Sequence, residues 1–446
     1  MAELKRKIDI YLKEWKNSKN RKPLIIKGAR QIGKTTSIEK FGRENYKSFI
    51  EINYISMPQY KQIFQDGYTT ENIIKNISLL NSEYKFIPGD TLIFFDEMQE
   101  YPDTATSLKF FNEDGRFDVI CSGSLMGINY NQIHSNSVGN KEDYTMRSLD
   151  FEEFLWAKGY SEEQIESLYT CMKEIKPLTN TQFDVMMNNF KDYLITGGMP
   201  EIVSTFIDNK NFSGILNMQQ KLLADYEEDI TKYAGGLDKS KILDAYKKIK
   251  IFLGNDNKKF QITKLKDGAR NREYVGVIDW MDRAGIINIS YALDHLEMPL
   301  KANYNPDNYR LYFGDTGLLI GSLDEESQSD LRNNQNFGTY KGALYENIVA
   351  EMLTKAGFDL FFYREEQSKI EMDFIIRDEK SIIPVEVKAG DNATYSLNRL
   401  IDEKQYKNIK YGIKLCNKNI GFNGKFYTFP YFMTFMLKRF LKEKQN

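Results

Sequence analysis

Apolar and polar residues change places along the first 150 positions in a pattern that predicts strands and helices in turn. Short apolar runs bounded by turn residues predict strands, and apolar residues at helical spacing predict helices. The expected strands are 23–26, 49–53, 91–95 and 119–124, and the expected helices are 1–20, 34–41 and 70–80. This alternation is typical of a parallel sheet with helices on both faces, so we expect an α/β fold.

The pattern changes to successive helices after about residue 150. Helices are expected at 151–158, 161–173 and 183–195. Further on, helices near 238–253, 262–267 and 273–284 are followed by a strand at 286–291, an order that resembles a winged helix-turn-helix. A polar, acidic stretch at 322–337 has the composition of a linker. Beyond it we expect a helix at 342–357, two strands at 371–376 and 382–388, and further α/β elements.

These changes in pattern divide the chain of 446 residues into several expected parts. A chain of this length is too long for one compact domain. The expected parts are an N-terminal α/β domain at 1–150, a helical connector at 151–235, a winged-helix-like module at 236–321, the linker, and a C-terminal α/β domain at 338–446.

Composition narrows the classes of function. The formal charge is -2, so no global positive charge draws the chain onto nucleic acid. Three scattered cysteines and two histidines argue against a zinc site, and any metal is expected to be a hard ion such as Mg²⁺. The N-terminus lacks a long apolar run and no stretch reaches the ~18 apolar residues of a membrane span, so we expect a cytoplasmic protein without membrane contact.

A glycine-bearing loop follows the first expected strand. Gly28-Ala-Arg-Gln-Ile-Gly33-Lys34-Thr35 matches GxxxxGK[ST], in which backbone N–H groups face a phosphate, the lysine contacts the β- and γ-phosphates and the hydroxyl binds Mg²⁺. The helix that begins here adds the positive end of its dipole. Because a strand precedes the loop and a helix follows it, we expect an ATP-binding P-loop.

A second part of the expected nucleotide site follows the strand at 91–95. Four apolar residues precede Asp96 and Glu97. Asp96 is expected to hold Mg²⁺, and Glu97 suits a general base that polarises the attacking water. Ser122 and Ser124, at the end of the next strand, could sense the γ-phosphate or satisfy a tight turn at Gly123. The positions expected to contact nucleotide are Gly28, Arg30, Gly33, Lys34, Thr35, Thr36, Asp96 and Ser124.

Taken together, these motifs resemble the AAA-type P-loop ATPases of bacteria and archaea (AAA_14-like) that are fused to a C-terminal DUF4143 domain. Four further segments carry the resemblance in the family's order: Leu149–Leu155, Gly197–Glu201, Leu311–Gly317 and Pro384–Gly390. Many members have a Gly-Arg pair before the first of these, but this chain has Val138-Gly139-Asn140. Arg116 and Arg147 are both candidates for an arginine finger, or a partner could supply the charge.

The segment 371–388 predicts a hairpin that gathers acids near a lysine. If residues 378–381 form a four-residue loop, Asp373 lies opposite Glu386, and Lys388 shares the face of Glu386. Two facing carboxylates are unfavourable unless a cation lies between them. Asp373 and Glu386 are therefore expected to bind Mg²⁺, with Lys388 orienting or deprotonating water and Glu346, in the preceding helix, completing the site.

This C-terminal arrangement resembles the PD-(D/E)XK nuclease fold, and the resemblance implies that DNA is the substrate. The alternative is an ion cluster in a fold that has lost cleavage and only binds nucleic acid or protein. A basic cluster around the expected winged helix could contact phosphates, although acids lie among its members and a helical linker or dimer contact explains it equally well: Lys258, Lys259, Lys264, Lys266, Arg270 and Arg272.

Two functional hypotheses follow. In the first, ATP binding and hydrolysis gate a Mg²⁺-dependent nuclease-like domain that acts on DNA. In the second, the protein is an ATP-dependent switch whose nuclease-like domain is inactive and grips nucleic acid or a protein. The sequence leaves open the biological process, the nucleic acid recognised, and whether the chain forms a homo-oligomer or needs a protein partner.

Overall fold

Five parallel strands form the N-terminal sheet. In the computed structural model, which describes residues 4–124, 137–233, 239–253, 274–323, 325–333, 338–365, 369–388, 394–403 and 405–444, the strand order is β2-β3-β4-β1-β5. The strands are β1 (Leu24–Gly28), β2 (Ser48–Asn53), β3 (Thr91–Asp96), β4 (Asp118–Ser124) and β5 (Glu142–Thr145). The parallel sheet expected from the sequence is confirmed. The edge strand β5 escaped prediction because its residues are polar and partly exposed.

Helices cover this sheet on both faces. Successive residues of each strand point to opposite faces, so Leu24 and Ile26 of β1 join one hydrophobic core while Ile25 joins another. The first core contains α1 (Lys7–Asn17) and α2 (Lys34–Asn45), and the second contains α3 (Thr70–Leu80) and α4 (Thr104–Asp114). The first core continues without a break into the C-terminal half of the chain.

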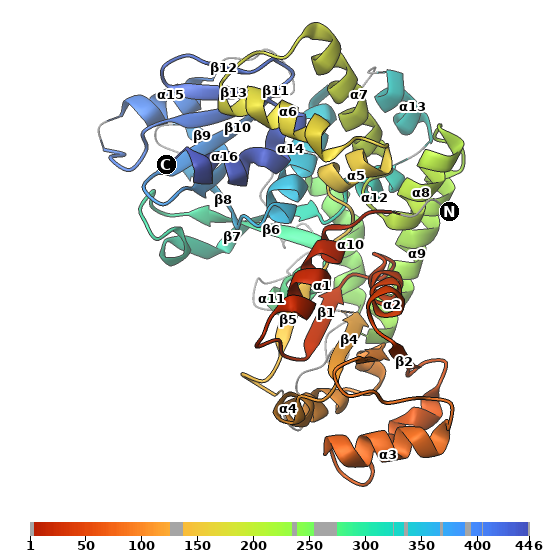
Figure 1. Ribbon diagram of the computed structural model, residues 1–446. Helices are drawn as coiled ribbons and strands as arrows, with labels where there is room; N and C mark the ends of the chain where they lie inside the picture. The colour runs from red at the N-terminus through yellow and green to blue at the C-terminus, as the bar shows by residue number, and fades with distance from the viewer. Residues whose placement is uncertain are drawn as a thin grey trace.

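A group of helices follows the N-terminal sheet in the chain and is drawn in yellow to green shades in Figure 1. It comprises α5 (Phe151–Ala157), α6 (Glu162–Lys173), α7 (Asn180–Thr196), α8 (Pro200–Asn209), α9 (Ile215–Tyr233), α10 (Lys239–Leu253) and α11 (Val275–Arg283). The helices expected at 151–158, 161–173 and 183–195 correspond to α5, α6 and α7. Helix α7 starts earlier than expected because Thr179 and Gln182 cap its N-terminus reciprocally.

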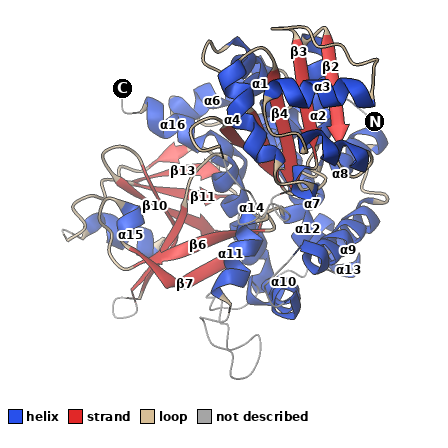
Figure 2. Ribbon diagram, turned by 90° about the horizontal axis from the view of Figure 1, so that it is seen from below, coloured by secondary structure: helices blue, strands red, loops and turns tan. Residues whose placement is uncertain are grey.

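The C-terminal sheet has eight strands and is mixed (Figure 2). Its order is β12-β13-β11-β10-β9-β8-β6-β7. The strands are β6 (Ile287–Leu293), β7 (Tyr304–Phe313), β8 (Leu360–Glu365), β9 (Ile370–Arg377), β10 (Ile382–Lys388), β11 (Gly412–Cys416), β12 (Gly421–Phe422) and β13 (Phe426–Pro430). The accompanying helices are α12 (Thr316–Gly321), α13 (Glu325–Asn333), α14 (Gly338–Lys355), α15 (Tyr395–Asp402) and α16 (Leu437–Glu443).

The strand expected to close a winged-helix module belongs instead to this C-terminal sheet. Strand β6 pairs antiparallel with β7 and parallel with β8, which lies beyond the expected linker. The linker stretch itself contains α13. A separate winged helix is therefore not shown, because long-range pairing recruits its strand. The expected helix at 262–267 and the basic cluster around it lie outside the described residues.

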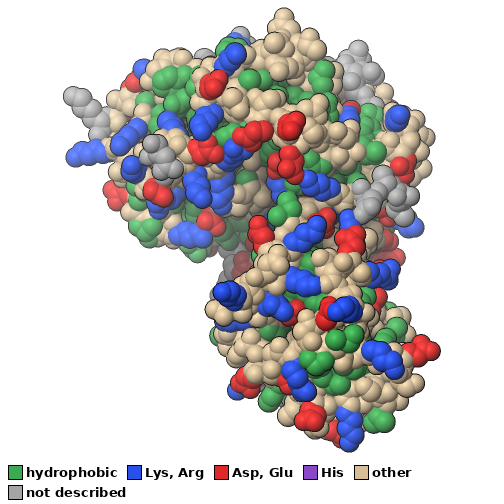
Figure 3. Space-filling view, viewed as in Figure 1, with side chains coloured by type: hydrophobic (Ala, Val, Ile, Leu, Met, Phe, Trp, Pro, Cys, Tyr) green, Lys and Arg blue, Asp and Glu red, His purple; other side chains and the backbone are tan. Residues whose placement is uncertain are grey.

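Charge is dispersed over the surface. Lysine and arginine side chains are interspersed with acidic ones on the face drawn in Figure 3. None of the helices in the described ranges combines the length and apolar character that crossing a bilayer requires.

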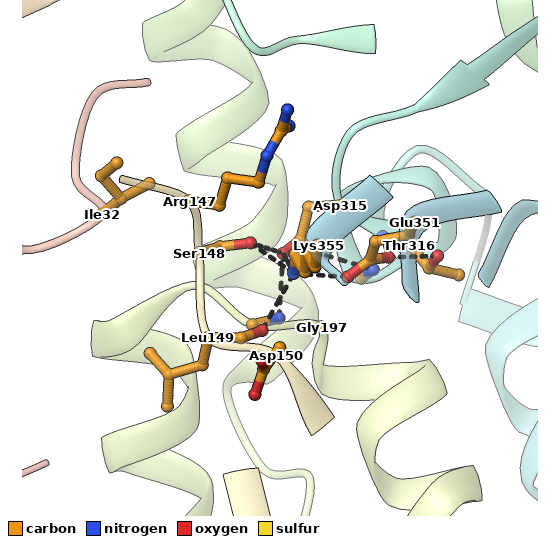
Figure 4. Close-up of polar contacts among 12 residues, drawn as sticks. Ile32, Arg147, Ser148, Leu149, Asp150, Gly197, Asp315, Thr316, Glu351 and Lys355 are labelled. Atoms are coloured by element: carbon orange, nitrogen blue, oxygen red, sulfur yellow. Dashed lines mark hydrogen bonds and ion pairs between the residues drawn. The ribbon is translucent and has the colours of Figure 1, made fainter. Parts of the chain in front are cut away.

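A buried polar network joins the two halves (Figure 4). The Lys355 ammonium, at the end of α14, donates to Ser148 Oγ at 2.8 Å, Leu149 O at 2.9 Å, Tyr193 OH at 3.1 Å and Glu351 Oε1 at 2.6 Å. Its side chain is only 4% exposed. One lysine thereby binds the segment after β5, helix α7 and its own helix α14.

Asp315 completes this network from the start of α12. Its Oδ2 accepts hydrogen bonds from Ser148 Oγ at 2.7 Å and from Gly198 N at 2.9 Å. Glu351, fully buried, accepts from the Thr316 amide at 2.6 Å. Three of the four segments that carry the family resemblance thus meet around Lys355, although the first and the last of the three are more than 150 residues apart in the sequence. We call Ser148, Tyr193, Asp315, Glu351 and Lys355 the interdomain network.

Replacing Lys355 with methionine should destabilise the whole chain. The methionine keeps the apolar stem but leaves Glu351 buried without its cation, and breaking a buried pair in this way costs about 3–5 kcal/mol. Urea unfolding followed by circular dichroism should show that loss. The control is Lys438→Met, which removes an exposed lysine bound to Gly357 O and should change stability by less than about 0.5 kcal/mol. Equal midpoints for the two variants would contradict this account of the network.

Candidate functional site

The loop between β1 and α2 has the backbone that a phosphate-binding loop needs. Gly33 has φ +86°, a left-handed value that favours glycine, and it directly precedes the first residue of α2. A Cβ at Gly28 would lie 2.4 Å from Met146 O, so glycine is required there for close packing against the segment after β5. The two glycines of the motif are therefore required for different physical reasons.

Lys34 is buried against this loop. Its Nζ donates to Gly28 O at 3.3 Å and to Ala29 O at 2.8 Å. Burial lowers the pKa of Lys34 to about 8, although Glu97 and Asp96 favour the charged form. A buried ammonium that meets backbone carbonyls is suited to an anion that would satisfy it better.

Three side chains of the site donate hydrogen bonds to Asp96. It ends β3, is 1% exposed, and accepts a hydrogen bond from Thr35 Oγ1 at 3.1 Å and from Asn53 Nδ2 at 2.8 Å. The Ser122 hydroxyl also donates to its Oδ1. The structure thus brings Thr35 and Asp96 together, and their oxygen atoms are the donors that Mg²⁺ prefers. This donor set fits the ion.

Asn53 was not predicted as a site residue, because a lone asparagine at the end of a strand gives no distinct signal. Its position becomes meaningful only once β2 and β3 pair with Asn53 opposite Asp96. Of the two serines considered, Ser122 contacts Asp96. Ser124 is buried, and its amide donates to Gln99 Oε1 at 3.1 Å.

Glu97 stands beside Asp96 in a strained backbone conformation. Its φ of 58° is left-handed, which is uncommon for a residue with a side chain. The Gln99 side-chain amide donates to its carboxylate. Such strain is stored at functional sites more often than elsewhere, which is consistent with the expected part of Glu97 in activating water.

Thr36 and Gly33 border a cavity of about 820 Å³. The cavity runs from the N-terminal turn of α2 to helices α8 and α9, and Arg6 lies on its wall. Arg6 donates to Ile32 O at 3.0 Å and to Arg147 O at 2.8 Å, so it joins the loop to the segment after β5. This cavity is large enough for a nucleoside beside the loop.

Three arginines were considered for the site, and they lie in different surroundings. Arg30 forms an ion pair with Asp229 of α9. Arg116 pairs with Asp114 at 2.7 Å on the surface. Arg147 lines a separate cavity of about 400 Å³ between the N-terminal sheet and α11, and burial lowers its pKa. Arg30 is thus the one of these three that belongs to the loop itself.

The C-terminal hairpin has the register expected from the sequence. Ile382 lies opposite Arg377 and Val385 opposite Phe374, with residues 378–381 as the loop. Lys388 Nζ lies 2.9 Å from Glu386 Oε1, and Asp373 Oδ2 accepts from the Val387 amide at 2.8 Å. Burial opposes the charge on Lys388, but Glu386 and Asp373 outweigh it and raise its pKa. The two carboxylates therefore favour the charged form of Lys388.

The Glu346 carboxylate contacts a tyrosine and an arginine. Its Oε1 accepts from Tyr312 OH at 2.5 Å and lies 3.5 Å from Arg310 Nη1. Arg310, which is buried, also donates to Glu371 at 2.5 Å. Within the described ranges, no group of three or more acidic, histidine or cysteine side chains could hold a metal ion. Asp373 and Glu386 interact as a pair, and Glu346 contacts Tyr312 and Arg310.

Three family models match successive parts of this chain. Residues 20–155 match one described as an AAA domain, 187–329 match a domain of unknown function (DUF8612), and 341–432 match another (DUF4143). The chain contains an AAA-type P-loop ATPase domain and a DUF4143 domain. The AAA domain comprises the parallel sheet, the P-loop and Asp96. The DUF8612 match extends from α7 to α13, across the expected winged-helix module.

No curated protein sequence matches the chain significantly. Among solved structures, the Walker-type ATPase PABY2304 of Pyrococcus abyssi is similar, at 13% identity and a TM-score of 0.43, over 72% of this chain and 96% of that one. The Thermotoga maritima RuvB Holliday junction branch migration motor has 12% identity and a TM-score of 0.32, over 74% and 95%. Aeropyrum pernix ORC1, solved with DNA, has 8% identity and a TM-score of 0.29, over 74% and 91%.

The low pKa of Lys34 makes ATP binding depend on pH. Phosphates favour the charged lysine, so its pKa rises on binding. Above about pH 8 the free lysine is mostly neutral, and binding takes up as much as about one proton, whereas below pH ~7 the lysine contributes no uptake. ATP affinity should therefore fall as pH rises beyond 8. Calorimetry in two buffers of different ionisation enthalpy measures the uptake.

The control for this prediction is Lys34→Arg, whose side chain stays charged throughout. If the variant binds ATP, its binding should show no such uptake at pH 9. Equal proton uptake by the wild type at pH 7 and pH 9 would contradict the assignment.

Proposed function

We propose that this protein binds ATP with Mg²⁺ at the P-loop, hydrolyses ATP, and transmits its nucleotide state to the C-terminal half. The observation that carries the proposal is the meeting of Lys34, Thr35 and Asp96 at the carboxyl edge of a parallel sheet. Thr35 and Asp96 would hold Mg²⁺, which would offset charge on the phosphates. Residues 1–150 would form the ATPase unit.

The nucleoside would occupy the cavity beside Gly33 and Thr36. In a P-loop the phosphates lie over the first turn of the helix, so the rest of the ligand must leave along a flank of that helix. The cavity of about 820 Å³ opens on the flank of α2, and helix α9 lies on its far side. A bound nucleotide would thus contact both the AAA domain and the helices that follow it.

Glu97 would act as the general base. Water attacks the γ-phosphorus, a new P–O bond forms, the bond from phosphorus to the β-phosphate oxygen breaks, and the water proton passes to the Glu97 carboxylate. The products are ADP and inorganic phosphate. Gln99, which now donates to Glu97, would have to release that carboxylate when water is bound.

The interdomain network is the structural basis proposed for transmission. Arg6 connects the P-loop carbonyl of Ile32 to Arg147, whose neighbour Ser148 is bound by Lys355. A change at the loop would therefore reach α14 through Arg6, Ser148 and Lys355. The AAA domain need not touch the C-terminal sheet for this to occur.

A second candidate function is Mg²⁺-dependent cleavage of DNA by the C-terminal domain. One observation favours it: Glu386 Oε2 is buried and has no hydrogen-bond partner among the described residues. Burial raises the pKa of Glu386 despite Lys388. A divalent cation between Glu386 and Asp373 would satisfy that oxygen. The alternative is an inactive domain that grips nucleic acid or a protein, which the engagement of Glu346 favours.

Two substitutions should separate ATP binding from ATP hydrolysis. Lys34→Ala should abolish binding of a fluorescent ATP analogue, because the buried ammonium that would contact the phosphates is lost. Glu97→Gln should bind ATP but hydrolyse it about 10²–10⁴ times more slowly, since a general base contributes that much. Glu113→Gln, an exposed change on α4, is the control and should match the wild type. Unchanged phosphate release in Glu97→Gln would exclude Glu97 as the base.

DNA cleavage by the purified full chain with Mn²⁺, with and without ATP, tests the second function. If the domain is a nuclease, Asp373→Asn should lose activity by at least about a hundredfold because a metal ligand is lost. The matched control is Glu379→Gln, an exposed change at the tip of the same hairpin, which should keep full activity. No cleavage of single-stranded, duplex or branched DNA by the wild type would favour the inactive binding domain.

A further inference from the structure

Helix α9 holds the phosphate-binding loop through side chains from three of its residues. The Arg30 guanidinium forms an ion pair with Asp229. Gln31 Nε2 donates to Asp225 Oδ2 at 2.9 Å, and Tyr226 OH donates to Arg30 O at 3.2 Å. A helix outside the AAA domain therefore grips the two loop residues that precede Ile32 and Gly33.

The two partners of the ion pair are buried unequally. The Asp229 side chain is 4% exposed, and its Oδ2 is buried without a hydrogen-bond partner among the described residues. The Arg30 side chain is 36% exposed. Burial raises the pKa of Asp229 in spite of Arg30, so the pair does not fully offset the burial of the carboxylate. Asp229 is fixed within the protein, whereas Arg30 has room to turn.

Arg30 also belongs to the electrostatic field of the phosphate site. Lys34 Nζ donates to the carbonyl oxygen of Ala29, the residue directly before Arg30, so the same short loop carries both cations. Two cations on one phosphate-binding loop favour a shared anion, and the terminal phosphate of ATP is the anion that such a loop holds.

We infer that Arg30 is an arginine that contacts the terminal phosphate of ATP from within the P-loop itself, and that Asp229 holds it away from this position before ATP binds. The inference rests on the proposed binding of ATP. It supplies, from the same chain, a positive charge that the absent Gly-Arg pair does not provide. ADP lacks the terminal phosphate and leaves Arg30 on Asp229.

The movement of Arg30 from Asp229 to the terminal phosphate would also affect helix α9. Once Arg30 turns to phosphate, Asp229 is left buried without its ion-pair partner, which is strongly unfavourable. Helix α9 therefore favours a shifted position in the ATP state. Gln219 of α9 donates to Ile195 O at 2.6 Å and packs against Gly321 of α12, and Lys232 lies 3.3 Å from Glu100, which follows the Asp96 segment. A shift of α9 would therefore reach α7 and α12, and also the segment that follows β3.

The test is the affinity of the full chain for ATP and ADP, measured by competition with a fluorescent nucleotide. Asp229→Asn frees Arg30, so it should tighten ATP binding about tenfold relative to ADP, within the usual range of coupling between sites. Arg30→Gln should remove most of the preference for ATP. In the double variant, Asp229→Asn should have no further effect, because its action passes through Arg30.

Glu228→Gln is the matched control, since it removes an exposed acid of the same helix that does not line the nucleoside cavity. It should leave the ratio of ATP to ADP affinity unchanged. Hydrogen exchange adds a second readout, because a purely structural ion pair would not respond to the nucleotide: ATP, but not ADP, should speed exchange in α9 of the wild type and of Glu228→Gln.

The outcomes separate the two proposals. No nucleotide binding by the wild type would overturn the proposed function itself. Two results would overturn this inference and leave the proposed ATP binding intact. In the first, Asp229→Asn changes the affinities for ATP and for ADP by the same factor. In the second, Asp229→Asn still changes the ratio of the two affinities when Arg30 is replaced. Thermal melting of each variant distinguishes a misfolded chain from a changed preference.

Discussion

The buried ammonium of Lys355 is the contact on which the arrangement of the two halves depends. It is bound by a hydroxyl, a carbonyl, a phenol and a carboxylate that come from three separate regions of the chain. Burying a charge is costly unless every partner is in place, so this lysine tolerates one arrangement of those regions and penalises others. A continuous apolar core that runs from α1 to α16 supplies the driving force, and the network supplies the specificity.

The position of this network explains how a phosphate site at one end could act on a sheet at the other. Ser148 is bound by Lys355, and the preceding residue, Arg147, offers its carbonyl to Arg6, which also binds the P-loop. Helix α9 also contacts the same loop. The loop is therefore held by two elements outside the AAA sheet, and a ligand that changes the loop must change at least one of these contacts.

The two acidic sites of the chain differ in their surroundings. Asp96 accepts hydrogen bonds from Thr35, Asn53 and Ser122, so its carboxylate is held in a fixed position. Glu386 has one oxygen on Lys388 and one without a partner, while Glu346 is bound by Tyr312 and Arg310. An arginine near a carboxylate supplies the charge that a metal would supply. The first site is therefore more completely organised than the second.

By itself, the sequence determined the features that depend on local order: the strand, loop and helix around Gly28–Thr35, the acid at the end of β3, and the register of the hairpin that carries Asp373 and Glu386. These follow from short-range periodicity and loop length, which neighbouring residues alone specify. Tertiary structure decided which strands share a sheet, so β6 joined β8 across the expected linker. It also decided that Asn53 meets Asp96, that Asp229 meets Arg30, and that Glu346 turns to Arg310, because such contacts depend on residues distant in sequence and carry no local signal.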